Sequence, residues 1–524
     1  MRIIHQIAKA SLNRSAIRFK RATHRIEAVQ REKLHELLSL AGKRQPHSKL
    51  NPQSIVPYEL WRDQAPITTY DDWRDLVDEQ KSTGNHIVSG EPCARYQPTS
   101  GSSSRIKWIP YTKRFLWELD QAISPWMNGI YDSFPKTRQG QHYWSLSWIP
   151  TELRQKVDDN VNNDLEILPW WKRIFAQKMM AVPDSIAYAN TSDESMFATL
   201  CYLSGNKNLS IMSIWSPTFL LSLVRELSNN RQLVATVLKE GQWGDFAQGL
   251  QKTKCPKSSR AAQILASWDG VIEEQFLREL WPNLALISSW DTASAKVWAS
   301  ELREIFPHVG WQAKGLWATE GAVTFALGDQ FPLAINSHFY EFKDLETGDI
   351  LPSWEIRKNG VYQPILSTGS GLMRYQLADQ VKVDGFLGTC PTLTFLGRLD
   401  GTDLVGEKIA ASRAQEILTS LNKGFPIRAV TLIATKVAST GQKPYYALLA
   451  KGSITPDEEA RLAQEVEAKL QEDFHYKLAR DLKQLRPAQV HVTPQAYEVY
   501  QERLVAKGMV VGNMKVEPLV QWSD

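Results

Sequence analysis

Short apolar runs alternate with helical stretches through the middle of the chain, and this alternation constrains the fold more than any other feature. The run 208–215 (NLSIMSIW) is typical of a buried strand, and 294–306 (SAKVWASELREIF) is typical of a helix. The apolar stretch 209–224 is interrupted by Pro217 and is shorter than the roughly 20 residues of a membrane span. It therefore predicts a core strand, a turn and a buried helix, with no transmembrane segment.

A smaller α+β unit is predicted after the composition changes near 397–408. The runs 427–438 and 444–452 alternate and are typical of paired antiparallel strands. Thr455 and Glu458 have the spacing of a capping box, which predicts the start of a helix. This unit has its own strands and helices, so we expect it to form a separate domain.

The expected fold class is α/β, with a large N-terminal domain over 1–397 of mixed sheets and helices. A small α+β C-terminal domain over 398–524 follows, joined by a hinge near 398–401. The large domain begins with a basic helical arm over 1–44, which holds 11 Lys and Arg and 3 Glu. A membrane-surface or RNA-binding helix is one interpretation. We favour a charged outer face of helices packed on their own domain.

Charge and cysteine content exclude some classes of protein. The net charge of +4 is too small to indicate nucleic-acid binding. The 4 cysteines lie far apart and form no CxxC pattern, which indicates neither a disulfide framework nor a zinc site and fits a reducing cytosol. We expect a cytoplasmic protein that works as a monomer.

The segment 99–104 (TSGSSS) gathers small hydroxyl residues around one glycine, and Lys107 follows. Backbone N–H groups and hydroxyls in such a turn can bind phosphate oxygens, and a lysine adds charge. The GxxxxGK[ST] pattern is absent, which argues against the usual NTPase folds. Taken alone, the segment is better explained by a solvated surface loop.

Acidic residues follow strand-like segments at two further places. Thr319 and Glu320 come directly after an apolar strand, where open α/β sheets place their ligands, and a carboxylate there can help to hold Mg²⁺. The segment 372–386 is interpreted as one strand that brings Tyr375 and Asp379 to one end, where the aspartate can accept ribose hydroxyls. An exposed loop glutamate and a turn aspartate are the ordinary alternatives.

Basic residues stand out in the last part of the chain. Arg398 directly follows a strand, Lys408 lies on the next segment, and Lys515 interrupts an apolar tail over 512–520. Single lysines are usually solvated, so none of these identifies a site alone.

The order and spacing of these segments resemble the GH3 acyl-acid amido synthetase family, within the adenylate-forming superfamily. The resemblance covers nearly the whole chain, and several stretches look like the bacterial branch of the family. TSGSSSRIKWIP looks like the family's first ATP motif, LWATEG like its second and MRYQLADQVKVDGF like its third. Each motif is weak alone, but their shared order is specific.

The resemblance implies a role for each matching residue. The ATP phosphates would be bound by Thr99, Ser100, Gly101, Ser102 and Ser103. Thr319 and Glu320 would lie by the α-phosphate, with Glu320 as the Mg²⁺ ligand. Asp379 would bind the ribose, and Tyr375 would lie near the nucleotide. Arg398 would reach the nucleotide from the hinge, Lys408 would approach the α-phosphate, and Lys515 would be a second catalytic lysine.

Two positions depart from the family pattern. Ser104 stands where the first motif usually has its second glycine, which could stiffen the phosphate loop. Ala378 stands where the third motif usually has glycine before its aspartate. Neither departure removes a charged group, so an active enzyme is still expected.

Aromatic residues are the candidates for the acyl pocket. Trp148, Trp215 and Phe219 would suit an aromatic or long apolar acid, although core packing explains them as well. His338 is a candidate substrate residue and base for the amine, and a structural histidine is the favoured interpretation.

The implied reaction uses ATP and Mg²⁺ to convert a carboxylic acid to an acyl-adenylate and pyrophosphate. The C-terminal domain would then rotate, and an amine or amino acid would take the acyl group as an amide. An acyl-CoA or carrier-protein ligase would share the first half, so it remains an alternative. A catalytically inactive scaffold that binds nucleotide or lipid is the alternative of another class.

Overall fold

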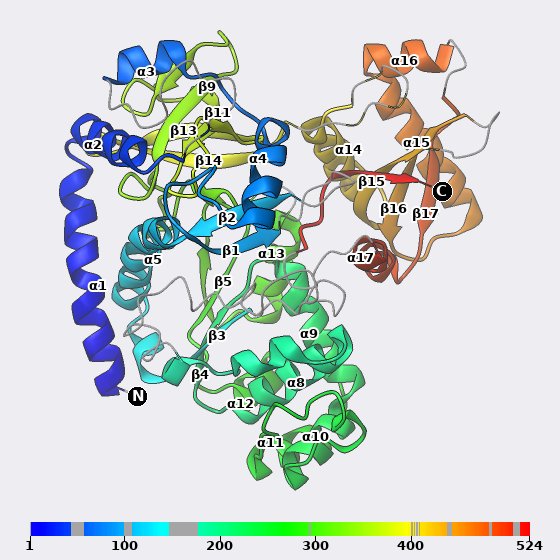
Figure 1. The fold of residues 1–524 in the computed structure, drawn as a ribbon. Coiled ribbons are helices and arrows are strands. Elements are labelled where there is room, and N and C mark those ends of the chain that lie inside the picture. Colours follow the sequence, from blue (N-terminus) through cyan, green and yellow to red (C-terminus); the bar gives the residue numbers. More distant parts are fainter. Residues whose placement is uncertain are drawn as a thin grey trace.

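The computed structural model describes residues 2–42, 44, 57–98, 107–145, 177–292, 295–399, 402, 404, 407, 409–436, 443–481, 485–506 and 514–523. Figure 1 shows a larger body that carries the N-terminal and central elements, and a smaller C-terminal body beside it. Among the described residues, no helix combines the length and the apolar character that crossing a membrane needs.

Helix α1 (Arg2–Ala22) lies along α5 (Lys113–Ser133) at one edge of the large body (Figure 1). The contact is polar as well as apolar, because His5 Nδ1 lies 2.7 Å from the Tyr131 hydroxyl and Lys9 pairs with Asp132. The basic arm therefore packs on its own domain.

The predicted helical arm consists of two helices. Helix α1 ends at Ala22, and α2 (Ile26–Ser39) begins after a short turn. The carbonyl oxygen of Thr23 accepts hydrogen bonds from the backbone N–H of Thr389, at 2.6 Å, and from its hydroxyl, at 2.9 Å. A contact from the distant loop at Thr389 thus holds this turn, which local periodicity could not reveal.

A parallel sheet with strand order β3-β4-β5-β6 forms one layer of the large body. Its strands are β3 (Gln141–Trp144), β4 (Leu209–Ser213), β5 (Leu286–Ser289) and β6 (Gly310–Ala313). The helices around it are α8 (Ser192–Gly205), α9 (Pro217–Asn229), α10 (Arg231–Glu240), α11 (Ser259–Ser267), α12 (Glu274–Leu280) and α13 (Lys296–Ile305), with short 3-10 turns at Pro135–Gln139, Asp184–Tyr188 and Gly244–Phe246. The predicted strand, turn and buried helix are confirmed as β4 and α9, and Pro217 occupies the first position of α9.

A second, antiparallel sheet has strand order β10-β9-β11-β13-β14, with β12 paired to β11. Its strands are β9 (Phe339–Asp344), β10 (Ile350–Pro352), β11 (Val361–Ser367), β12 (Tyr375–Gln376), β13 (Asp379–Leu387) and β14 (Cys390–Arg398). Two hairpins, β1 (Cys93–Pro98) with β2 (Trp108–Thr112) and β7 (Trp317–Ala318) with β8 (Gly321–Ala322), and the helices α3 (Tyr58–Gln64) and α4 (Tyr70–Thr83) complete the large body.

The prediction of one strand over 372–386 is wrong, because the chain forms β12 and β13 with a break between them. Both strands pair with β11, but on either side of Pro364. Proline has no backbone N–H to donate to a neighbouring strand. The carbonyl of Pro364 instead accepts the N–H of Leu377 at 3.0 Å, inside the break.

The C-terminal body is a four-stranded mixed sheet of order β17-β16-β15-β18. Its elements are α14 (Ala411–Gly424), β15 (Arg428–Lys436), β16 (Tyr445–Lys451), α15 (Pro456–Gln471), α16 (Phe474–Asp481), β17 (Gln489–Val492), α17 (Ala496–Ala506) and β18 (Leu519–Ser523). The predicted antiparallel pair β15–β16 and the Thr455–Glu458 capping box are both confirmed. The exact boundary between 397 and 398 remains a prediction.

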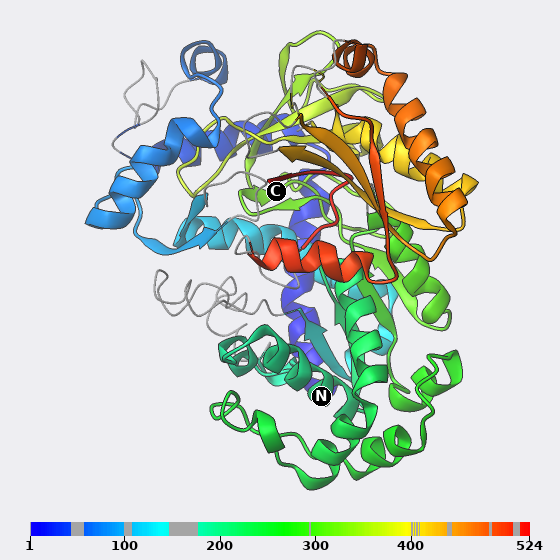
Figure 2. The same cartoon turned by 90° about the vertical axis from the view of Figure 1, so that its right-hand side faces the viewer.

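Helix α17 lies between the C-terminal sheet and helices of the large body (Figure 2). The Tyr497 ring on α17 lies 5.7 Å from the Trp298 ring on α13, and their residues belong to one hydrophobic core. Two ion pairs, Arg225–Glu498 and Arg428–Glu301, also join the bodies. Any rotation of the C-terminal body must therefore separate an apolar contact and these charges.

The buried histidine His142 gives a prediction for acid stability. Burial lowers its pKa to about 3, while its Nε2 donates to the Thr137 carbonyl at 3.0 Å. Below its ordinary pKa of about 6.5 the unfolded chain takes up a proton that the folded chain excludes, so the free energy of unfolding falls with pH down to about 3. Between about pH 7 and about pH 5, the titration of His142 should lower the free energy of unfolding by about 2 kcal/mol.

The variant His142→Gln tests this prediction, because glutamine can donate to the same carbonyl but does not titrate. Urea unfolding at about pH 7 and about pH 5 should show that the variant loses about 2 kcal/mol less than the wild-type protein. Equal losses in the two proteins would contradict the assignment to His142.

Candidate functional site

The Thr319–Glu320 pair forms the turn of the β7–β8 hairpin. The expected strand does end at Ala318, but it has two residues and is separate from the parallel strand β6, which ends at Ala313. The expectation that the pair ends a strand of the open sheet is therefore wrong. Gly315, with φ of 78°, turns the chain between the two strands, a conformation that favours glycine.

Tyrosine side chains from two other elements meet this turn. The Tyr111 hydroxyl on β2 donates to the Thr319 carbonyl at 3.0 Å, and the Tyr375 hydroxyl on β12 donates to Glu320 Oε1 at 3.3 Å. Burial raises the pKa of Tyr70, and the charge of Glu320 is among the smaller causes acting in the same direction. The structure therefore brings Glu320 and Tyr375 together, as expected for residues of one site.

Asp379 and Arg398 lie opposite each other in the β13–β14 ladder. Asp379 begins β13 and Arg398 ends β14, so both mark the same end of the antiparallel sheet. Asp379 is 9% exposed, and it lies three residues beyond Gln376, the last residue of β12. Neighbouring strand ends thus supply Asp379, Tyr375 and the backbone of Arg398.

Lys515 connects the C-terminal body to the large body through contacts with aromatic rings. Its ammonium lies 4.1 Å from the ring of Trp290, which follows β5, and 5.9 Å from the ring of Phe395 on β14. A cation over an indole face is attracted by the ring. Lys515 therefore contacts both sheets of the large body, although the sequence gave no sign of either partner.

The two described acyl-pocket candidates differ in their surroundings. Phe219 is 6% exposed and belongs to the core around α9, so core packing explains it. Trp215 follows β4 and is half-buried beside Trp290 and Trp317, at ring distances of 5.4 and 6.3 Å. Core packing therefore explains Phe219, whereas the Trp215 side chain stays partly exposed.

Several predicted residues lie outside the described part of the chain. These are Thr99, Ser100, Gly101, Ser102, Ser103, Trp148 and Lys408, with Ser104 and the hinge positions 400–401. The side chain of Arg398 is also outside it. The segment 99–106 joins β1, which ends at Pro98, to β2, which begins at Trp108.

His338 is completely buried, and both its ring nitrogens are engaged. Nε2 accepts the backbone N–H of Ala322 at 3.2 Å, so the ring proton is on Nδ1, which lies 2.9 Å from Glu118 Oε2. The nitrogen that a general base would use is thus occupied by the backbone next to the Thr319–Glu320 turn. This geometry agrees with the favoured interpretation of a structural histidine.

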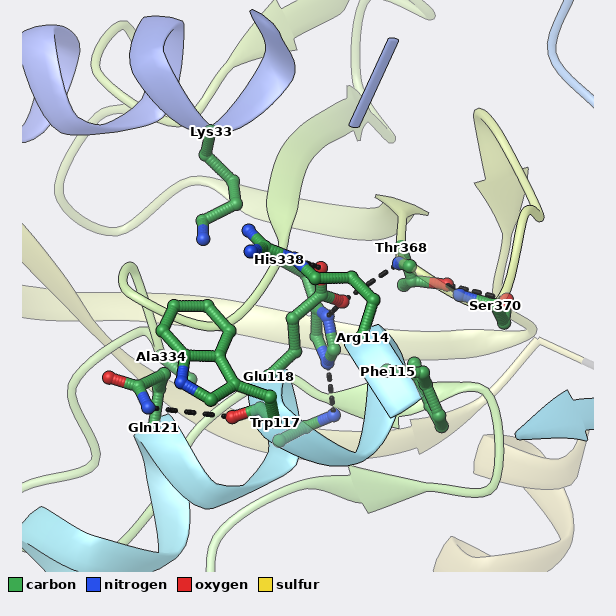
Figure 3. A network of polar contacts seen from close by, with 12 residues as sticks. Lys33, Arg114, Phe115, Trp117, Glu118, Gln121, Ala334, His338, Thr368 and Ser370 are labelled. Carbon is green, nitrogen blue, oxygen red and sulfur yellow. Dashed lines mark hydrogen bonds and ion pairs between the residues drawn. The ribbon is translucent and has the colours of Figure 1, made fainter. Parts of the chain in front are cut away.

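Glu118, on the buried face of α5, is the centre of a polar network (Figure 3). Besides the His338 contact, its carboxylate accepts Arg114 Nε at 3.1 Å and the backbone N–H of Gly369 at 2.8 Å. Glu118 therefore joins α5 to the β7–β8 hairpin through His338 and to the turn at Gly369 directly. The sequence signal for this buried network was an acidic residue, Glu118, on the apolar face of an amphipathic helix.

Two glycines allow the chain to approach this pair closely. A Cβ at Gly321 would lie 2.9 Å from His338 Nε2, and a Cβ at Gly369 would lie 2.9 Å from Glu118 Oε1. Both distances are too short for a side chain. The turn that carries Glu320 is therefore packed directly on the buried His338–Glu118 pair.

Replacing Glu118 should destabilise the fold. Glu118→Gln turns one acceptor oxygen into a donor that faces the N–H of Gly369 or the guanidinium of Arg114, so we expect a loss of about 3 kcal/mol. Glu36→Gln is the matched control, because Glu36 pairs with the same arginine but its side chain is 40% exposed. That change should cost less than about 1 kcal/mol in urea unfolding. Similar losses in both variants would contradict the central role of Glu118.

Comparison with known proteins identifies the family. The chain matches the GH3 family N-terminal domain over residues 16–310, the central domain over 331–398 and the C-terminal domain over 410–524. It is 21% identical to indole-3-acetic acid-amido synthetase GH3.15 of Arabidopsis thaliana, over 66% of this chain and 63% of that relative. It is 23% identical to jasmonoyl--L-amino acid synthetase JAR4 of Nicotiana attenuata, over 71% of this chain and 69% of that one.

The fold also matches solved structures. The GH3.15 acyl acid amido synthetase superposes with a TM-score of 0.77 at 17% identity, over 96% of this chain and 92% of that chain. The AtGH3.15 complex with 2,4-DB gives a TM-score of 0.80 over 96% and 93%. These matches confirm the predicted α/β fold. Because family domains cover most of its length in the expected order, the chain belongs to the GH3 family.

Proposed function

We propose that this protein is an ATP-dependent acyl-acid amido synthetase, which adenylates a carboxylic acid and transfers the acyl group to an amine or amino acid. The observation that supports this most strongly is the meeting of Glu320 and Tyr375, next to the strand ends that hold Asp379 and Arg398. Glu320, Tyr375 and Asp379 lie in segments that resemble the family's second and third ATP motifs, and Arg398 lies at the expected hinge. Relatives across the family are named as amido synthetases or amino acid ligases.

In the first half-reaction, a carboxylate oxygen of the acid attacks the α-phosphorus of ATP. The new bond is carboxyl oxygen to phosphorus, the bond to the bridging oxygen breaks, and pyrophosphate leaves. Thr99, Ser100, Gly101, Ser102 and Ser103 would donate to the phosphates, and Lys408 would stabilise the charge that develops there. Asp379 would accept the ribose hydroxyls, with Arg398 and Tyr375 beside the nucleotide.

The site also suits Mg²⁺. One carboxylate, Glu320, lies in the hairpin turn, and Mg²⁺ commonly binds one or two carboxylates together with substrate phosphates. When bound, the ion would neutralise phosphate charge. Tyr375 would orient Glu320 through its hydroxyl, since that group already donates to the carboxylate.

In the second half-reaction, a neutral amine attacks the acyl carbonyl. The carbon–nitrogen bond forms, the bond to AMP breaks, and the proton lost by the amine passes to solvent. Lys515, which lies over the Trp290 ring, would be the second catalytic lysine and would come from the C-terminal body. We further propose that the protein is cytoplasmic and acts as a monomer.

Exchange of labelled pyrophosphate into ATP tests the first half-reaction. With Mg²⁺ and no acceptor, an acid that the protein activates should stimulate exchange, and adding amino acids should then release an amide and AMP. Mass analysis identifies the product. A thioester formed with CoA, and no amide with any amino acid, would contradict the proposed second half.

The variant Lys408→Ala should lower the exchange rate at least about a hundredfold, because it removes a charge that stabilises the transition state. Lys423→Ala, at the exposed end of α14, is the matched control and should exchange at the wild-type rate. Exchange is measured with both proteins shown to be folded by circular dichroism. Unchanged exchange in Lys408→Ala would overturn the role given to this lysine.

A further inference from the structure

Two residues other than glycine have a left-handed backbone in the described part of the chain, Asn359 with φ of 67° and Arg374 with φ of 49°. Asn359 is exposed in the loop between β10 and β11, and asparagine commonly adopts this conformation. Arg374 is 4% exposed, and its Cβ disfavours the conformation. A strained residue persists only where its surroundings hold it, and such residues cluster at functional sites. Local turn chemistry thus explains Asn359, whereas Arg374 needs another explanation.

A buried ion pair holds the side chain of Arg374. Its Nε donates to Glu341 Oε2 and its Nη2 donates to Glu341 Oε1, both at 2.9 Å. The carboxylate is 1% exposed and also accepts the Tyr58 hydroxyl at 3.1 Å. The Nη1 of Arg374 donates to the carbonyl of Arg62 at 2.8 Å and to that of Ala65. Because a paired fork fixes the plane of the guanidinium, this side chain has one orientation.

The backbone around Arg374 is held as well. Its N–H donates to Ser367 Oγ at 2.9 Å, and its carbonyl accepts the N–H of Thr68 at 2.9 Å. The Thr68 hydroxyl donates to the Met373 carbonyl at 2.9 Å, and the Thr68 carbonyl accepts the N–H of Gln376 at 2.8 Å. Strand β12 pairs with β11 on its other side. The strained position is therefore fixed by contacts on both sides of the chain.

The residue that follows this position is Tyr375, whose hydroxyl donates to Glu320 Oε1 at 3.3 Å. The hydroxyl lies at the far end of a long side chain, so a small backbone rotation at Arg374 displaces it. At 3.3 Å the hydrogen bond has little tolerance for a longer distance. The contact between Tyr375 and Glu320 thus depends on the backbone conformation of Arg374.

We propose that Arg374 is a positioning residue, whose buried pair with Glu341 holds the left-handed backbone that places the Tyr375 hydroxyl on Glu320. Neither member of the pair needs to touch the nucleotide. The consequence for ATP rests on the proposed function, in which Glu320 helps to hold Mg²⁺. Residues that orient a metal ligand typically change metal affinity about 10- to 100-fold when they are replaced.

The variant Arg374→Lys keeps the charge opposite Glu341 and loses the planar fork. Fluorine NMR of protein labelled with 3-fluorotyrosine follows Tyr375 directly, and the signal that disappears in Tyr375→Phe assigns it. Arg374→Lys should move or broaden this signal, whereas Asn359→Gly, the matched control at the other left-handed position, should leave it in place. An unchanged Tyr375 signal in Arg374→Lys would overturn the inference.

The variant Glu320→Gln shows whether the signal reports the contact itself. It should shift the Tyr375 signal in the wild-type background and cause no further shift when it is added to Arg374→Lys, because the contact is already lost there. The same additional shift in both backgrounds contradicts the proposed link between Arg374 and Glu320.

Calorimetric titration without any acid measures the consequence for ATP. Arg374→Lys should bind ATP with Mg²⁺ about tenfold more weakly than the wild-type protein, with nearly unchanged affinity for ATP in EDTA. Tyr375→Phe should cause a similar loss, and combining the two changes should add nothing to it. A merely structural arginine predicts instead equal losses with and without Mg²⁺, or additive losses in the double variant, and either result would refute the positioning role.

The two measurements separate this inference from the proposed function. Displacement of the Tyr375 signal in a protein that binds no ATP would support the positioning role and overturn the proposed reaction. ATP binding with an undisplaced signal would do the reverse. If Arg374→Lys does not fold, Ser367→Ala replaces it, because it removes only the hydroxyl that accepts the Arg374 N–H. It should displace the Tyr375 signal in the same way, and an unchanged signal would again reject the inference.

Discussion

The buried carboxylate of Glu118 connects the parts of the large body that carry the candidate site. It is on α5, and it holds the turn at Gly369 directly and the β7–β8 hairpin through His338. A buried charge must be satisfied by several donors, and here Arg114, His338 and a backbone N–H supply them. The position of Glu320 thus depends on a helix that is 200 residues away in sequence, and on glycines that leave room for the pair.

The site is assembled from sheets with different roles. The antiparallel sheet supplies Tyr375, Asp379 and Arg398 at its strand ends, whereas Trp215 and Trp290 directly or closely follow strands of the parallel sheet. The β7–β8 hairpin lies between them in sequence and carries Glu320. Lys515 reaches Trp290 and Phe395 from the C-terminal body, so one lysine touches both sheets. Residues from both sheets, from the hairpin and from the C-terminal body thus contribute to one candidate site.

Local sequence signals predicted local structure well. The capping residue Thr455, the turn at Pro217 before α9 and the β15–β16 pair were all predictable from the sequence, because they depend on near neighbours. Other features depend on residues that are distant in the sequence. Thr389 holds the turn between α1 and α2, and Pro364 on β11 separates β12 from β13. Neither partner is visible in the segment whose structure it changes.

The sequence by itself determined the types and the order of the residues proposed to bind the nucleotide, because motifs are local and the resemblance rests on their spacing. The tertiary structure alone decided which side chains meet. It put the Tyr375 hydroxyl on Glu320, used both nitrogens of His338 inside the fold, and placed the Lys314 ammonium 4.6 to 5.8 Å from the rings of Trp126, Trp144 and Trp215. The physical reason is that hydrogen bonds, cation–π contacts and close packing act over a few ångströms, whereas these residues are separated by tens to hundreds of positions along the chain.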